Sequence, residues 1–180
     1  MRIPIPAVLP VIAIALTALA GCGGADSGPD GPPEDFAIAV EHSDGSLAPP
    51  AHVQWRLTVD GTGQGTLEYV PDYPGDGVPT FTAQFDVDAG ALDDLYAALD
   101  ERDLLRDIEP AADPPIGGAT ESATVTADGR TFEIPAYADS GPPLAPLERQ
   151  IHRLAPRSVW DDFAERREAY AAERYGDPAS

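Results

Sequence analysis

Alternating apolar and polar residues restrict the fold of this chain more than any other feature of its sequence. From residue 53 to residue 60 the order is VQWRLTVD, which places Val53, Trp55, Leu57 and Val59 on one face of an extended segment. Five further segments alternate in the same way: residues 36–41, 66–70, 81–85, 122–127 and 130–134. Because each segment buries one face and leaves the other polar, the pattern predicts an antiparallel sheet with one open face.

The glycine-rich connection at residues 61–65 predicts a hairpin and its register. A loop of three residues sets Leu57 opposite Leu67 or Tyr69, whereas a loop with an even number of residues would mix the two faces. Glycine also supplies the left-handed backbone conformation that a three-residue loop needs. We therefore expect the three-residue loop.

The dipeptide Asp128-Gly129 is the strongest hairpin signal in the chain. A two-residue turn at this point sets Val125 opposite Phe132 and Ala123 opposite Ile134. Both pairs are apolar and lie on the same face, so the turn and the side-chain pattern predict the same register.

Apolar residues spaced three or four positions apart predict two helices that cover the sheet. Asp88 is expected to cap the first helix, which runs from about residue 89 to residue 101, and Pro156 ends the second, near 142–154. The two stripes are Leu92, Leu95, Tyr96 and Leu99, and Leu144, Leu147, Ile151 and Leu154. Leu104 and Leu105 are expected to continue the first stripe.

A third helix is predicted over residues 158–174. Ser158, followed three residues later by Asp161, resembles a capping box, and Trp160, Phe163 and Tyr170 fall along one side. The sequence as a whole therefore predicts an α+β fold: an antiparallel sheet of five to six strands, two helices on one face, and a C-terminal helix that packs at an edge or extends away. We assign residues 36–175 to a single globular domain and expect a disordered tail at 176–180.

The charge and the single cysteine exclude several classes of protein. Formal net charge is -20, and this repels nucleic-acid phosphates and anionic lipid headgroups. All eleven cationic side chains are arginines, so no lysine is present to form a Schiff base. With Cys22 alone, neither an internal disulfide nor a cysteine-cluster metal site forms. The domain must therefore be held together by its apolar core.

The N-terminal segment has the layout of an export signal. Arg2 is followed by an apolar run over residues 8–20, which ends in Leu19-Ala20-Gly21-Cys22. This ending resembles the lipobox of bacterial lipoproteins. The resemblance implies a signal peptide over residues 1–21, an acylated Cys22, a flexible tether over 22–35, and anchoring to the cell membrane on its extracytoplasmic side. The alternative is a secreted or membrane-spanning protein with an incidental cysteine.

No recognisable motif for catalysis, cofactor binding or metal binding is present, so none of these sites is predicted. His42, His52 and His152 lie in separate segments without metal-ligand spacing, and a G-x-S-x-G sequence is lacking. Asp72 and Asp76 flank glycines but lack the acid spacing of a calcium loop. The residues that could indicate binding of a partner are aromatic residues expected near the surface: Tyr69, Tyr73, Trp160 and Tyr170. For Trp55 and Trp160, a place in the core is the favoured interpretation.

Residues 36–154 also look like a group of small uncharacterised bacterial extracytoplasmic domains. The similar stretches are "VDGTGQGTLEY", "LDDLYAALDERDLL", "TADGRTFEIP" and "PLERQIHRL". The resemblance rests on turn glycines and core positions, so it implies a fold and no catalytic residue.

These features favour a non-enzymatic, lipid-anchored module that binds a protein or small ligand at the cell envelope. This hypothesis predicts an exposed aromatic or apolar patch on the body. The alternative is a cell-envelope hydrolase, which predicts a hollow that gathers a histidine with Asp, Glu or Ser. A third hypothesis is an inhibitor-like module that presents loops 43–50 or 71–79 to an enzyme.

Overall fold

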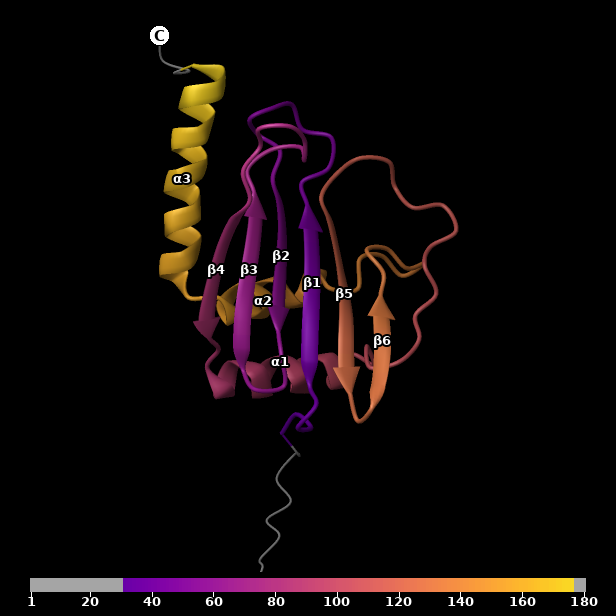
Figure 1. The fold of residues 1–180 in the computed structure, drawn as a ribbon. Coiled ribbons are helices and arrows are strands. Elements are labelled where there is room, and N and C mark those ends of the chain that lie inside the picture. Colours follow the sequence, from indigo (N-terminus) through magenta and orange to yellow (C-terminus); the bar gives the residue numbers. More distant parts are fainter. Residues whose placement is uncertain (1–30, 177–180) are drawn as a thin grey trace, which may run out of the picture.

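The computed structural model describes residues 31–176, which form one six-stranded antiparallel sheet and three α-helices (Figure 1). Along the sheet the order is β4-β3-β2-β1-β5-β6, so the first strand of the chain lies in the centre. The strands are β1 (Ala37–Ser43), β2 (Gln54–Val59), β3 (Gln64–Val70), β4 (Phe81–Asp86), β5 (Thr120–Ala127) and β6 (Arg130–Ile134). The α+β prediction and its strand number are confirmed. The predicted signal peptide, Cys22 and the tail beyond residue 176 lie outside the described residues.

Both predicted hairpin registers are confirmed. Leu57 of β2 is paired with Leu67 of β3, and the three-residue loop between these strands contains Gly63 at a φ of 81°. Val125 of β5 is paired with Phe132 of β6. In both cases the turn residues supply the positive φ values, so local sequence suffices to set the pairing.

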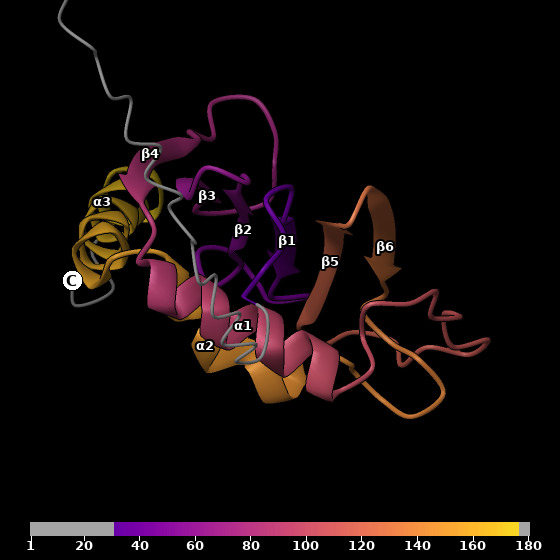
Figure 2. The same cartoon turned by 90° about the horizontal axis from the view of Figure 1, so that it is seen from below.

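One face of the sheet carries the core and the other is polar. The inward residues of β1 and β2 are buried, and α1 (Ala89–Glu101) crosses beneath them together with α2 (Glu148–Leu154) (Figure 2). A 3₁₀ turn, Ala145–Leu147, leads into α2. The buried helix residues are Leu95, Ala98 and Leu99 of α1, Leu147 of the turn, and Ile151 and Leu154 of α2. Within residues 31–176, no helix has the length and apolar character needed to cross a membrane.

The chain enters the domain at the end of the sheet that carries the β2–β3 and β5–β6 turns. The carboxylate of Asp35 accepts hydrogen bonds from the backbone N–H groups of Asp128 (2.9 Å) and Gly129 (2.6 Å). Next to Asp35, the carbonyl oxygen of Glu34 lies so close to Gly61 that a Cβ at this glycine would be 2.5 Å from the oxygen. The last residues of the predicted tether therefore contact the body and fix the point from which the chain leaves it.

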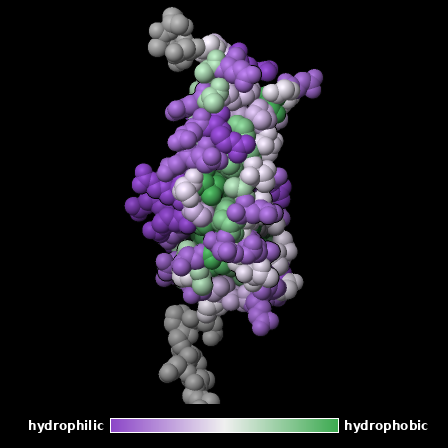
Figure 3. Space-filling model, turned by 60° about the vertical axis from the view of Figure 1, so that its left-hand side comes forward, coloured by the Kyte–Doolittle hydropathy of each residue, from purple (hydrophilic) through white to green (hydrophobic). Residues whose placement is uncertain are grey.

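The C-terminal helix α3 (Arg157–Tyr175) stands beside the β4 edge and continues past that strand (Figure 1). Phe163 is its one buried residue among those described and packs against the rings of Phe81 and Tyr69. The guanidinium of Arg166 lies over Phe81, 4.1 Å from the ring centroid. Figure 3 shows this side of the molecule as mostly hydrophilic, with a band of hydrophobic surface near its middle. The helix thus packs at an edge and leaves most of its length in solvent.

The capping box predicted at Ser158 is wrong. Pro156 occupies the N-cap position, no side chain caps the helix, and Ser158 already lies in the first turn. A serine caps only from the N-cap position, where its backbone is still extended. Asp161 instead pairs with Arg157 one turn before it, at 3.5 Å.

We predict that Asp88→Ala destabilises the fold by about 1 kcal/mol, because its side chain caps α1 by accepting a hydrogen bond from the N–H of Ala91 (3.1 Å). Ser158→Ala is the matched control and should change the free energy of unfolding by less than about 0.5 kcal/mol. Urea unfolding of the purified protein measures both. Equal losses in the two variants would show that the cap assignment is wrong.

Candidate functional site

The two loops at the end of the sheet opposite the point of chain entry lie side by side (Figure 1). They are the β1–β2 loop, residues 44–53, and the β3–β4 loop, residues 71–80. The hydroxyl of Tyr73 lies within hydrogen-bond distance of the carbonyl oxygens of Gly45 (3.1 Å) and Leu47 (2.8 Å). Tyr73 therefore ties one loop to the other. We call this region the distal end.

A buried histidine stiffens the same contact. His52 is 1% exposed, and its Nδ1 lies 2.8 Å from the carbonyl oxygen of Gly45. Since a carbonyl only accepts hydrogen bonds, Nδ1 must carry the proton. The imidazole also stacks on the ring of Tyr73, with 3.8 Å between centroids and 2° between planes. The loop is thus held by packing as well as by hydrogen bonds.

Helix α3 forms hydrogen bonds with both loops of the distal end. Nη2 of Arg167 donates to the carbonyl oxygens of Pro50 (3.0 Å) and Ala51 (3.2 Å). The hydroxyl of Tyr175 donates to the buried carboxylate of Asp72, whose other oxygen accepts from the N–H of Tyr73 (2.7 Å). The hydrogen bond to Asp72 raises the pKa of Tyr175. Hydrogen bonds therefore join the two loops and the C-terminal half of α3 into a single unit.

Large hydrophobic side chains are exposed on all three of these segments. Leu47 is 46% exposed, Tyr73 41% and Tyr175 45%. We call these three residues the distal surface. Tyrosine side chains that are already ordered bind a partner at low entropic cost, because little rotamer freedom remains to be lost. The arrangement is therefore suited to recognition of an apolar or aromatic group.

The α1–β5 loop, which includes residues 110–119, meets the distal end from the other side. A Cβ at Gly45 would lie 2.0 Å from the carbonyl oxygen of Gly118, so the two backbones are in contact there. Two residues earlier, Ile116 is fully exposed. With Ile116, all the large hydrophobic side chains that are exposed in the described part of the chain belong to the two distal loops or to segments that contact them.

His42 lies at the end of β1, between two carboxylates. Its Nε2 is 3.0 Å from Oδ1 of Asp44, and its Nδ1 is 3.5 Å from Oε2 of Glu121 on β5. The ring stacks on Trp55 of β2, with 4.9 Å between centroids. Burial by itself would lower the pKa of His42, but hydrogen bonding and charge from Glu121 and Asp44 outweigh this and raise the pKa above its usual value.

This geometry does not suit His42 to act as a general base. Each ring nitrogen faces a carboxylate, so neither is left to take a proton from a substrate. His42 itself lines a hollow of about 190 Å³, together with Glu121, Tyr137 and Glu148 among others. The ring of His152 lies against Trp160, 4.7 Å away, and that of His52 is buried. The hollow therefore gathers the residue types that the hydrolase hypothesis predicts, but the contacts of its histidine do not suit that histidine to catalysis.

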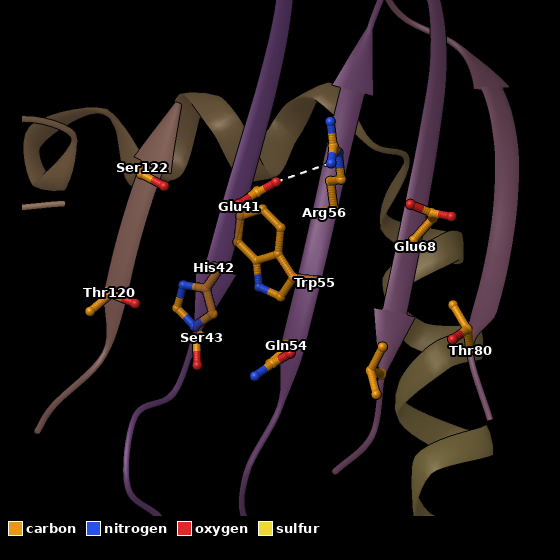
Figure 4. Close-up of a pocket in the computed structure, with 11 residues that line it drawn as sticks. Glu41, His42, Ser43, Gln54, Trp55, Arg56, Glu68, Thr80, Thr120 and Ser122 are labelled. Carbon is orange, nitrogen blue, oxygen red and sulfur yellow. Dashed lines mark ion pairs between the residues drawn. The ribbon is translucent and has the colours of Figure 1, made fainter. Parts of the chain in front are cut away.

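The open face of the sheet carries a second, larger hollow of about 540 Å³ (Figure 4). Glu41 and Arg56 point toward one another from neighbouring strands and form an ion pair at 3.1 Å. Further polar lining residues are His42, Ser43, Gln54, Glu68, Thr80, Thr120 and Ser122. Small-molecule sites are predominantly apolar and enclosed. This polar, open hollow is therefore a weaker candidate than the distal surface.

The aromatic residues singled out in the sequence differ in how far the structure exposes them. Trp55 is buried, which confirms its place in the core, and Trp160 is half-buried against it, with its indole N–H donating to the carbonyl of His152 (3.0 Å). Tyr69 was expected near the surface, but it is buried under α3, so that prediction is wrong. Tyr170 is half-buried and Tyr73 is exposed.

The sequence did not single out Leu47, Ile116 or Tyr175. The sequence signal that could have indicated their exposure is a single apolar residue within a loop. Leu47 stands before Ala-Pro-Pro, and Ile116 stands between Pro-Pro and Gly-Gly. The carboxylate of Asp72 accepts a hydrogen bond from the N–H of Tyr73 within its loop. Within residues 31–176, no group of three His, Cys, Asp or Glu side chains is placed to hold a metal ion.

A scan against protein-family models finds no match for this chain, and a search of curated proteins finds none with significant similarity. Function must therefore be inferred from the geometry of the chain's own residues.

We predict that Gly45→Ala costs more stability than Gly117→Ala. Both glycines have a left-handed backbone, with φ of 72° and 77°, so an alanine costs about 1–2 kcal/mol at either position. A Cβ at Gly45 also collides with Gly118, whereas one at Gly117 meets open space. The extra loss, roughly 1–3 kcal/mol, is measurable by urea unfolding. Equal losses would contradict the close contact between the loops.

Proposed function

We propose that this protein is a lipid-anchored extracytoplasmic binding module, which uses the distal surface to hold a protein or small ligand near the cell membrane. The observation that carries the proposal is the gathering of Leu47, Tyr73 and Tyr175 on cross-linked segments at one end of the body. An exposed patch of this kind is what a binding module requires.

The position of this surface fits a tethered protein. Asp35 holds the start of the domain against the β5–β6 turn, at the end of the sheet opposite the distal loops. In this proposal a lipid on Cys22 anchors a tether, of which the eleven residues from 23 to 33 precede the fixed Glu34 and Asp35 and span roughly 20 Å as a flexible coil. The distal surface then faces away from the bilayer, where partners are accessible.

The chemistry of the distal surface restricts the kinds of partner that it can bind. Two tyrosines and a leucine favour an apolar or aromatic group, and the net charge of -20 disfavours nucleic acid. The two loops at the distal end overlap the segments 43–50 and 71–79, which an inhibitor-like module would present. An enzyme is therefore one kind of protein partner that this proposal includes.

We predict that Cys22→Ala abolishes incorporation of a labelled fatty acid and leaves the N-terminal segment uncleaved, because the thiol is the acylated group in this proposal. Metabolic labelling, followed by mass analysis of the N-terminus, measures both effects. Ser27→Ala, in the same segment, is the matched control and should be labelled normally. Labelling that persists in Cys22→Ala would refute the anchor.

We predict that a photo-crosslinking amino acid in place of Leu47 captures a discrete partner in intact cells that express the full chain. The same amino acid in place of Thr82, exposed on the sheet, should not. Tyr175→Ala should reduce the yield from position 47, since loss of an aromatic anchor weakens binding by about 1–2 kcal/mol. Thr131→Ala, on an exposed part of β6, should not. Equal capture from both positions, or a yield insensitive to Tyr175→Ala, would contradict the proposal.

A further inference from the structure

One imidazole connects the distal end to the centre of the sheet. His42 is the penultimate residue of β1, and its two carboxylate partners come from different segments. Asp44 begins the β1–β2 loop, and Glu121 lies at the start of β5, just after the loop that contains Gly118. Nε2 is at hydrogen-bond distance from Asp44, whereas Nδ1 makes no hydrogen bond and faces Glu121 at ion-pair distance. When both ring nitrogens are protonated, the imidazolium therefore attracts both carboxylates through its charge.

We propose that His42, in its doubly protonated form, is a pH-responsive clasp that holds the loop of residues 44–53 against β5, and that it releases this loop when the imidazole loses a proton. The clasp would thus regulate the order of the distal surface. Its biological meaning rests on the proposed binding function, but its operation does not.

The surroundings of His42 are acidic. Asp44 and Glu121 face its two nitrogens, and Glu148 of α2 lines the same hollow of about 190 Å³. From β2, the uncharged ring of Trp55 covers the imidazole, and His152 of α2 packs against that indole at 5.4 Å. Arg56, the cation of β2 in this region, is paired with Glu41. A positive charge on His42 is therefore balanced by neighbouring carboxylates.

Loss of one proton changes this balance. A neutral imidazole has a single N–H, so it donates to only one of the two carboxylates. The other then faces a ring nitrogen lone pair, and the negative charges of Asp44 and Glu121 repel one another without a cation between them. Because Glu121 is held in the pairing of β1 with β5 and Asp44 begins the loop, this repulsion acts on the loop and loosens it.

The released contact is joined directly to the distal surface. The N–H of Asp44 donates to the carbonyl of Val53 (3.0 Å), which closes the base of the loop. The next residue, Gly45, accepts hydrogen bonds from His52 and Tyr73. Movement of Asp44 therefore disturbs the carbonyl on which both aromatic rings depend, and Tyr73 is part of the distal surface.

The direction of the effect follows from the raised pKa of His42. A group whose pKa is higher in the folded protein contributes stability that is fully present below its unfolded value of 6.5. That contribution is lost as the pH rises through the folded pKa. The loop is thus expected to be ordered in mildly acidic solution and looser in alkaline solution.

The test follows the three histidine ring signals and the backbone amides by NMR from pH 5 to pH 9, with the full chain in detergent micelles. We expect the His42 ring to titrate above pH 6.5. We also expect amide exchange in residues 44–53 to rise beyond the intrinsic base-catalysed increase over the same interval. A loop whose corrected exchange stays flat while His42 titrates would overturn the clasp.

Substitutions separate the clasp from a general effect of pH. His42→Gln should remove the pH dependence of loop exchange, and Glu121→Gln should shift the His42 midpoint to lower pH. His152→Gln is the matched control, since it also removes a histidine that contacts Trp55, and it should retain the wild-type profile. An unchanged profile in His42→Gln would overturn the proposal.

Loop exchange in His42→Gln and the His42 midpoint in Glu121→Gln are two separate readouts. Should His42→Gln fail to fold, the midpoint shift in Glu121→Gln carries the test, and an unshifted midpoint there overturns the clasp. Neither readout uses a binding partner. Loss of the pH dependence in His42→Gln therefore supports the clasp even if crosslinking from Leu47 fails. Successful crosslinking from Leu47 together with an unchanged pH dependence in His42→Gln refutes only the clasp.

Discussion

The pairing of β1 with β2 on one side and with β5 on the other holds the two halves of the sheet together. β1 is the first strand in the chain and lies in the middle of the sheet, so the meander β2–β3–β4 and the hairpin β5–β6 join only through it. Ile38 and Val40, on its inward face, are buried. Because the sheet lacks disulfides within the described residues, burial along this strand and its neighbours must stabilise the whole domain.

This central strand also separates the two ends of the molecule. At its start, Asp35 binds the β5–β6 turn and fixes where the chain enters. At its other end, His42 and Asp44 lead into the loop that carries Leu47. The proposed anchor and the proposed binding surface therefore lie at opposite ends of one strand. A rigid strand between them keeps the surface directed away from the point of attachment.

The histidines show how neighbours decide chemistry. In the sequence, His42, His52 and His152 are three equivalent titratable groups without metal-ligand spacing. In the fold, His52 becomes a buried donor to a carbonyl, His152 packs against indole rings, and His42 sits between Asp44 and Glu121. Because Glu121 is far from His42 in the chain, only the pairing of β1 with β5 brings the two together. No local pattern predicts that contact.

The sequence by itself determined the features that depend on a few adjacent residues: both hairpin registers, the Asp88 cap and the apolar stripes of the helices. It failed at Ser158, where the start of the helix after Pro156 decides which residue caps, and at Tyr69, which α3 covers. Tertiary structure alone decided the distal surface and the surroundings of His42. The physical reason is range: turns and helix caps are set by local backbone geometry and hydrogen bonds, whereas exposure and charge neighbours are set by segments distant in the chain.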